Sequence, residues 1–266
     1  MFYAKQYLLA QSLEEAYQAN QKRSAAVVGG MCWMKMGRRQ LQTVIDLSAL
    51  GLDEITPTAS GFAIGAMVTL RRLETHPGLE KAFGGAFAQA VRPIVGVQFR
   101  SCATVGGSVW GRFGFSDVLT VLLALDAKVE LYPSGVIALE DFIKMPRDNQ
   151  ILVRVLVEAD GRRAAVESCR NSATDFPVLV TAAARMADGS WRLAVGARPQ
   201  KAALVRQELP PCPAADAIAP ALAEGLAALP FGGNMRAGEE YRRHLAPVLL
   251  RRAITKLEED APWKSN

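Results

Sequence analysis

The sequence has few of the residues that most metal sites and hydrolytic centres need. It contains two histidines, His76 and His244, and four cysteines that are scattered along the chain without any Cys-x-x-Cys pair. This pattern predicts neither a zinc site nor an iron–sulfur cluster on this chain. No Ser-His-Asp, Cys-His or paired-carboxylate arrangement is suggested by the spacing, so we expect no catalytic acid–base residues.

Long apolar runs and clustered basic residues are also missing. No run approaches the length of about 20 residues that crosses a bilayer, and the N-terminus lacks the basic and apolar regions of a signal peptide. The net charge of +5 is spread without the interleaved aromatics that nucleic-acid binding favours. We therefore expect a cytoplasmic protein with no membrane span and no nucleic-acid partner.

Two glycine pairs are the most informative features that are present. They lie in the segments Val27 to Met31 and Ala103 to Ser108, each an apolar, partly β-branched run that ends in Gly-Gly. Such a turn can adopt positive φ and brings backbone N–H groups close to a ligand, and successive N–H groups form an anion site suited to a pyrophosphate. Gly-Gly also occurs at Gly84-Gly85 and Gly232-Gly233, but two such turns at strand ends predict a dinucleotide held along its length.

A Ser-Asp pair follows the second glycine pair and opens an apolar stretch. Ser116 is expected to cap a helix that runs to Leu125, which places Asp117 in the first turn, where anions are also favoured. Asp117 is then available to accept a hydrogen bond from a ribose or ribityl hydroxyl. The alternative is that the pair serves only as a helix cap.

These motifs, with others in the same order, carry a resemblance to a known family. The matching segments are Ile45-Asp46-Leu47, Ile64 to Leu70, Gln98 to Ser101, Thr104 to Ser108, Ser116-Asp117, Leu122 to Ala127, Asp141-Phe142, Asp175-Phe176-Pro177 and Arg236 to Arg243. In this the chain resembles the FAD-binding subunit of the molybdenum hydroxylases, the family of xanthine and carbon monoxide dehydrogenases. The resemblance covers nearly the whole chain.

The resemblance implies an α+β fold of the PCMH-type FAD-binding class in three parts. Residues 1–52 would form a small β-α-β subdomain, residues 53–160 a mixed α/β middle subdomain, and residues 161–266 a C-terminal domain of sheet and helices. FAD would lie between the first two parts, with the third closing over it. Gly161 to Arg163 marks the expected joint, and the Ala-rich stretch Phe176 to Met186 is expected to be helical.

The glycine segments and the resemblance together predict the FAD contacts. The predicted cofactor-binding residues are Val28, Gly29, Gly30, Met31, Cys32, Trp33, Ile94, Val95, Thr104, Gly106, Gly107, Ser108, Ser116, Asp117 and Leu152. Met31 and Cys32 stand where the family usually has a hydroxyl residue and an acid, and Ser108 replaces an Asn. Each replacement removes a side-chain hydrogen bond worth roughly 1 kcal/mol, so the contacts should depend more on the main chain than usual.

The function that the resemblance implies is electron transfer. The chain would carry non-covalent FAD and pass electrons to NAD or another acceptor, as in xanthine dehydrogenase. Molybdopterin and [2Fe–2S] clusters would lie on two partner subunits. Two alternatives remain open: a structural subunit that has lost FAD, suggested by Met31, Cys32 and Ser108, and a stand-alone flavin oxidase, for which Cys32 is the candidate for covalent attachment.

Overall fold

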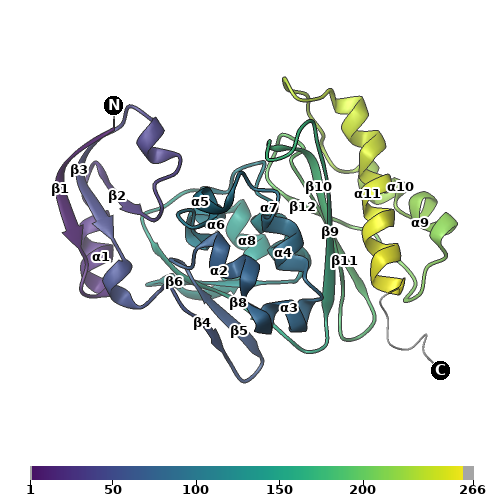
Figure 1. Cartoon of the computed structure of the whole chain (residues 1–266), viewed down its shortest axis with the longest axis horizontal. Helices are drawn as coiled ribbons and strands as arrows, with labels where there is room; N and C mark the ends of the chain where they lie inside the picture. Colours follow the sequence, from purple (N-terminus) through teal and green to yellow (C-terminus); the bar gives the residue numbers. More distant parts are fainter. Residues whose placement is uncertain (1, 260–266) are drawn as a thin grey trace.

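The computed structural model describes residues 2–259, and three β-sheets follow one another along the long axis of the molecule (Figure 1). Helices and strands are mixed throughout, which confirms the expected α+β class. Each sheet falls within one of the three parts expected from the sequence. We keep the division at residues 52 and 160 as a proposal, because the parts also pack tightly on one another.

The first sheet is parallel and has the strand order β1-β3-β2. Its elements are β1 (Tyr3–Leu9), α1 (Leu13–Asn20), β2 (Ala25–Val28), the 3-10 turns η1 (Met34–Met36) and η2 (Ser48–Leu50), and β3 (Gln40–Asp46). Ser12 caps α1 by accepting a hydrogen bond from the Glu15 N–H. Strand β1 was not identified from the sequence, because as an edge strand it is exposed on both faces and carries no apolar alternation.

The second sheet is antiparallel, with the strand order β4-β5-β8-β6-β7. Its strands are β4 (Ile55–Pro57), β5 (Gly61–Gly65), β6 (Lys128–Tyr132), β7 (Gly135–Ala138) and β8 (Ile151–Glu158). The helices of this part are α2 (Leu70–Thr75), α3 (Pro77–Phe83), α4 (Ala86–Val91), α5 (Val97–Arg100), α6 (Val105–Gly111), α7 (Asp117–Ala124) and α8 (Leu139–Lys144). The main hydrophobic core lies among them, with Phe83, Phe87 and Leu119 almost fully buried. Helices α6 and α7 thus rest on a rigid base.

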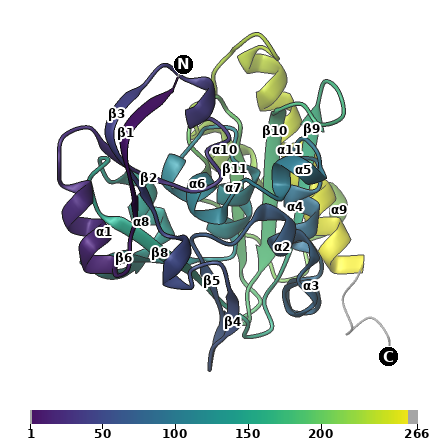
Figure 2. The same cartoon turned by 60° about the vertical axis from the view of Figure 1, so that its left-hand side comes forward.

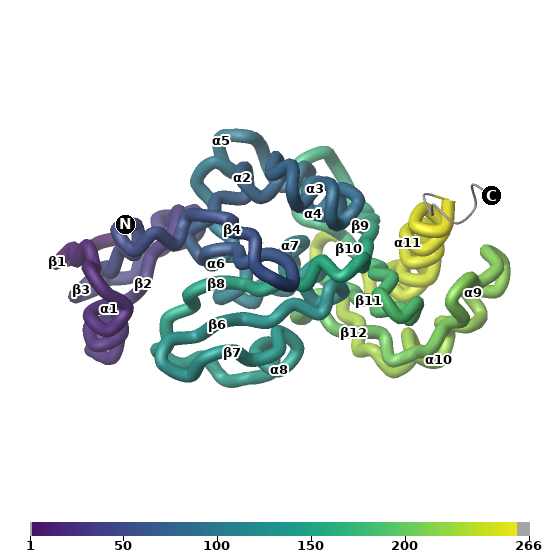
Figure 3. Tube along the Cα trace, turned by 90° about the horizontal axis from the view of Figure 1, so that it is seen from below, coloured from purple at the N-terminus to yellow at the C-terminus, as the bar shows by residue number. Residues whose placement is uncertain are grey.

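The third sheet is also antiparallel, with the order β12-β11-β10-β9. It comprises β9 (Arg163–Arg170), β10 (Pro177–Arg185), β11 (Trp191–Gly196) and β12 (Ala203–Val205). Helix α11 (Glu239–Glu259) packs on β9 and β10, while α9 (Ala215–Ala221) and α10 (Ala223–Ala227) lie at the end of the molecule far from β1 (Figure 3). Within residues 2–259, the helices α9, α10 and α11 therefore follow this sheet.

The expectation of a helix over residues 176–186 was wrong, because this stretch is strand β10. Helix α7 packs on one face of β10 and α11 on the other. Val180, Ala182 and Ala184 accordingly face one core, whereas Leu179 and Ala183 face a second. A strand buried on both faces shows no polar alternation and resembles a buried helix in sequence. Its alanines let two helices approach one sheet.

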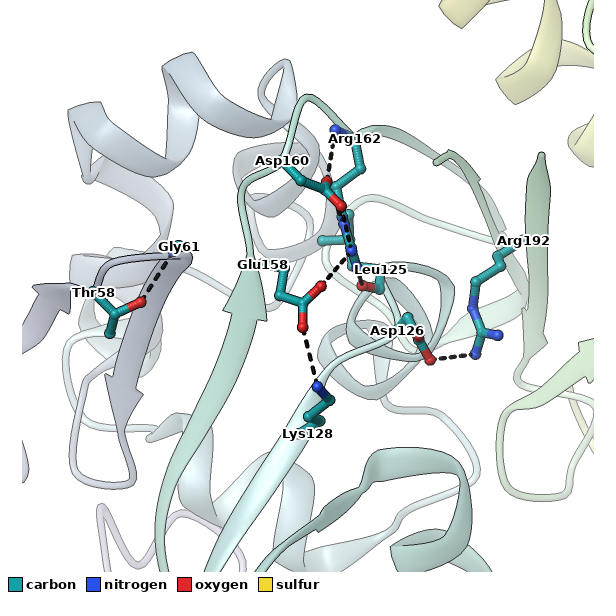
Figure 4. Close-up of polar contacts among 9 residues, drawn as sticks. All are labelled: Thr58, Gly61, Leu125, Asp126, Lys128, Glu158, Asp160, Arg162 and Arg192. Carbon is teal, nitrogen blue, oxygen red and sulfur yellow. Dashed lines mark hydrogen bonds and ion pairs between the residues drawn. The ribbon is translucent and has the colours of Figure 1, made fainter. Parts of the chain in front are cut away.

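The expected joint at residues 161–163 is a fixed connection. Arg162 is buried, and its guanidinium donates to Asp160, to Glu158 and to the carbonyl oxygen of Leu125 at 2.7 to 2.8 Å (Figure 4). The hydrogen bond from Arg162 lowers the pKa of Asp160 to about 2. Arg192 of β11 adds an ion pair of 2.9 Å to Asp126 at the end of α7. The third part is therefore bonded directly to the middle part.

Two further questions concern residues 2–259, namely whether they contain a membrane-spanning helix or a metal site. Within that range no helix has both the length and the hydropathy that crossing a bilayer requires. In the same range no three His, Cys, Asp or Glu side chains gather in a way that could hold a metal ion.

Candidate cofactor-binding site

A cavity of about 340 Å³ opens where the three parts of the chain meet. Helix α6 lies between the first and third sheets there (Figure 2). The walls come from residues 27–34, from α6 and the segments flanking it, from the start of α7, and from residues 170–177. Its volume lies in the range of small-molecule sites. Trp33 and Val95 are each nearly half exposed, so the cavity reaches the surface.

The first glycine segment, residues 29–33, follows directly from strand β2 and lines the cavity. Within the described residues, none of its five backbone N–H groups donates a hydrogen bond to the protein. Gly30 is required by packing, since a β-carbon built on it would lie 1.8 Å from the carbonyl oxygen of Cys102. The expectation of positive φ at the glycines was wrong, because Met31 adopts it, with φ of 54°.

In the second glycine segment, residues 104–108, the four amides of residues 105–108 donate within the protein. Thr104 caps α6, and its Oγ1 accepts from the Gly107 N–H at 3.1 Å. The N–H groups of Val105 and Gly106 donate to the carbonyls of Val68 and Ala66, and that of Ser108 donates to Thr104. The expectation of a Gly-Gly turn at a strand end was wrong here, because both glycines lie in the first turn of a helix.

Ser116 and Asp117 begin α7 beside the cavity, as the sequence predicted. Ser116 is the N-cap and accepts from the Leu119 N–H at 3.1 Å. Asp117 is buried, and its Oδ1 accepts from Nη2 of Arg170 at 2.6 Å. Burial raises the pKa of Asp117 to about 6, although Arg170 partly opposes this shift. The carboxylate is thus ionised at neutral pH, and one of its oxygens is occupied by a protein partner.

Arg170 continues this polar chain into the third part. Its Nη1 donates to the carbonyl oxygen of Asp175 at 2.6 Å, and the Asp175 carboxylate pairs with Arg236 at 3.1 Å. The hydrogen bond from Arg236 is the largest cause of a lowered pKa at Asp175. The sequence reasoning did not assign Arg170 to the site, because it lies 53 positions from Asp117 with no motif around it.

An aromatic cluster, also not foreseen, lies at the same cavity. It consists of Trp33, Phe113, Phe115 and Phe176, one or two from each part of the chain. Trp33 stacks on Phe176 with ring centroids 5.5 Å apart, and Phe113 stacks on Phe115 at 5.2 Å. Arg236 lies over Phe176 at 4.8 Å. In the sequence, Phe115 could have indicated this cluster, because it immediately precedes the Ser116–Asp117 pair.

All but two of the predicted site residues line this cavity. Ile94 and Val95 do so from the turn after α4, where Val95 has φ of 49°. Gly106 does not, since it packs against Ala66. Leu152 does not either, because it lies on β8 in the main core. For the residues that do line the cavity, contact with FAD remains a prediction.

Comparison with known proteins assigns the family. The model of the FAD-binding domain in molybdopterin dehydrogenase matches residues 3–159. The chain belongs to this family. That assignment confirms the resemblance seen in the sequence, and it makes the chain a homologue of the flavin-carrying part of molybdopterin-dependent oxidoreductases.

Curated sequences and solved structures resemble the chain. The uncharacterised protein YgfM of Escherichia coli K12 is 26% identical over 165 residues, which span 62% of this chain and 62% of YgfM. Carbon monoxide dehydrogenase from Hydrogenophaga pseudoflava is 22% identical, with a TM-score of 0.83 over 94% of this chain and 96% of that one. Quinoline 2-oxidoreductase from Pseudomonas putida 86 is 21% identical, with a TM-score of 0.83 over 97% and 96%. At these identities the structures establish the shared fold alone.

Proposed function

We propose that this chain binds FAD non-covalently in the cavity and is the electron-transfer flavoprotein of a molybdenum hydroxylase complex. The observation that carries the proposal is the row of five backbone N–H groups at residues 29–33. The residues that carry these groups line the cavity, and the groups find no acceptor among residues 2–259. Buried or partly buried amides are almost always paired, so an anionic ligand such as a pyrophosphate fits here.

The residues around this row would supply the other contacts with the cofactor. Thr104, Gly107 and Ser108 would shape the wall beside the first glycine segment, where the amides of Gly107 and Ser108 already bond to Thr104. Asp117 would orient a sugar or ribityl hydroxyl with the oxygen that Arg170 leaves free. The aromatic cluster would exclude water from the apolar end of the cavity. When bound, FAD supplies the redox chemistry, because it exchanges electrons both singly and in pairs.

The finer parts of the function are proposals as well. Molybdopterin and [2Fe–2S] clusters would lie on two partner subunits, and NAD or another acceptor would take the electrons, as in xanthine dehydrogenase. Support for an outside acceptor comes from Trp33 and Val95, through whose exposed faces the cavity reaches the surface. A cytoplasmic location is supported by the cysteines, all four of which are free thiols.

A ligand series tests the flavin proposal without any substitution. The purified chain, stripped of flavin, is titrated with FAD, FMN, riboflavin and ADP, and binding is followed by calorimetry. If the amide row binds the pyrophosphate, FAD should bind at least a hundredfold more tightly than riboflavin, and ADP should compete with FAD. Equal affinity for FAD and riboflavin would rule out the amide row as the anchor.

The structural subunit that has lost FAD is the second candidate, and one observation favours it. Arg170 already holds the Asp117 carboxylate, and the rings of the aromatic cluster pack on one another, so both groups have partners within the chain. Absence of any FAD binding in the titration, with the chain folded, would support this candidate. Flavin that stays with acid-precipitated protein would instead support the stand-alone oxidase and attachment at Cys32.

A further inference from the structure

Two free thiols lie at the contact between the first and middle parts of the chain. Cys32 belongs to the first glycine segment, and Cys102 precedes the second by two residues. In the proposed cofactor site Cys32 contributes only its backbone, and Cys102 contributes nothing. The two side chains are therefore free for another role.

The backbone geometry brings together the two segments that carry these cysteines. Gly30 packs so closely on the other segment that a β-carbon built on it would lie 1.8 Å from the Cys102 carbonyl oxygen and 3.0 Å from the Ala103 nitrogen. The sulfur of Cys32 lies 3.6 Å from the carbonyl oxygen of the same Gly30. The thiol of Cys32 thus turns back toward the residue that touches Cys102. Disulfides require such neighbouring backbones.

Exposure and charge give the two thiols different characters. Cys102 is exposed, whereas Cys32 is half-buried. Burial raises the pKa of the Cys32 thiol, and a negative charge on Cys102 raises it further. That effect on Cys32 requires the two sulfur atoms to lie within electrostatic reach of each other. An oxidant in solution would therefore react with Cys102 first, while Cys32 lies nearby as a protonated thiol.

We propose that Cys32 and Cys102 form a reversible disulfide when the protein meets a hydroperoxide. The Cys102 sulfur takes one oxygen from the peroxide to give a sulfenic acid and releases water or an alcohol. The Cys32 sulfur then attacks the sulfenic sulfur, the S–S bond forms, and the sulfenic hydroxyl leaves with the Cys32 proton as a second water. A dithiol reductant returns two electrons and restores both thiols.

The bond would change the site that it borders. It would fix the first glycine segment to the chain just before α6, so the amide row could no longer adjust to a ligand. The effect on a ligand depends on the proposed flavin function, but formation of the bond does not. The pair is thus an oxidisable site in its own right.

Peptide mapping of the full chain tests the proposal directly. Trypsin places Cys32 in residues 24–35 and Cys102 in residues 101–112, with no second cysteine in either peptide. After treatment with hydrogen peroxide without added flavin, these two peptides should be recovered joined. Two of the four thiols should be lost, and dithiothreitol should restore them.

Substitutions make the result specific. The Cys32→Ser variant should accumulate the Cys102 sulfenic acid, trapped by dimedone, because its resolving thiol is gone. The Cys212→Ser variant removes another exposed cysteine and should form the 32–102 bond as the parent does. Loss of thiols without the joined peptide, or equal pairing with Cys169 and Cys212, would overturn the proposal. Both readouts are independent of flavin, so failure here would leave the flavin proposal standing.

Discussion

The first and second glycine segments look alike in sequence but differ in what they offer a ligand. Each has an apolar run before Gly-Gly, and each lines the cavity. In residues 29–33, as far as the described chain shows, the amides have no protein acceptor, whereas those of residues 105–108 donate to Thr104, Ala66 and Val68. Glycines allow close approach of another group in both places. Only the hydrogen-bond partners of the amides reveal whether that group is protein or ligand.

The largest effect is expected at Gly30, where the two segments touch. In Gly30→Val the new side chain would overlap the Cys102 carbonyl, and overpacking against backbone that cannot move should cost roughly 4 kcal/mol of unfolding free energy. FAD binding should be lost with it. Urea unfolding and FAD titration measure the two effects.

The matched control is Gly96→Val. Gly96 is extended, and its added β-carbon would meet only the Gln98 side chain, at 3.5 Å. It should remain near parental stability. Retention of stoichiometric FAD by Gly30→Val would remove the first segment from the site and end the contrast between the two.

The second expected effect lies at Asp117. Because the amides of residues 105–108 already bond within the protein, the middle part should contact the ligand mainly through side chains such as this one. Asp117→Ala removes a charged acceptor, worth roughly 1.5–3 kcal/mol in hydrogen bonding, and FAD affinity should fall ten- to a hundredfold. It also leaves Arg170 buried without its carboxylate, which should cost about 3 kcal/mol of stability. Unchanged FAD affinity in the folded variant would reduce Ser116–Asp117 to a capping pair.

The same carboxyl predicts a pH dependence with a definite sign. The pKa of Asp117 is raised by burial from 3.8 to about 6 in the folded chain, so the folded state holds this proton more tightly than the unfolded state. Its contribution to the unfolding free energy is therefore greatest below about pH 4 and falls as pH rises to about 6, by at most about 3 kcal/mol. The parent and Asp117→Asn are compared by urea unfolding at pH 4 and pH 6.5. The free energy of unfolding of the parent, relative to that of the variant, should be lower at pH 6.5 than at pH 4. An equal difference at both pH values would contradict the raised pKa.

A smaller effect is expected at Gly106, which serves packing alone. A β-carbon there would lie 2.5 Å from the Ala66 carbonyl oxygen, so Gly106→Ala should cost about 1–3 kcal/mol of stability. Because Gly106 does not line the cavity, FAD affinity in the folded fraction should change less than threefold. A loss of FAD affinity out of proportion to stability would place a ligand contact in the second segment after all.

The sequence predicted those parts of the site that depend on neighbours along the chain. The Ser116 cap and the strand that ends at the first glycine pair both depend on residues within a few positions. The prediction for the second glycine segment was wrong because the amides of Val105 and Gly106 meet carbonyls from a segment nearly 40 residues earlier.

Long-range packing also explains the other differences. Arg170 reaches Asp117 only because β9 lies beside α7 in the folded chain, and β10 was taken for a helix because helices cover both of its faces. Each error concerns a contact that no local pattern encodes. Hydrophobic periodicity identifies an element that is buried on one face, but it does not distinguish a helix from a strand that is buried on both faces.

The smallest effect on stability is expected at Gly107, and it gives the comparison its sharpest test. Gly107 is helical, and its added β-carbon would approach only Thr104 Oγ1, at 3.2 Å. Gly107→Ala should therefore change stability by less than about 1 kcal/mol, because better helix propensity offsets the mild contact. Its amide already bonds to Thr104, so the methyl group affects a ligand only by occupying cavity space. FAD affinity should fall by no more than about tenfold, a loss of at most about 1.4 kcal/mol. If Gly107→Ala instead abolished FAD binding in a stable protein, as expected for the first segment, the ligand phosphates would have to lie against α6, and the contrast drawn from the amides would be wrong.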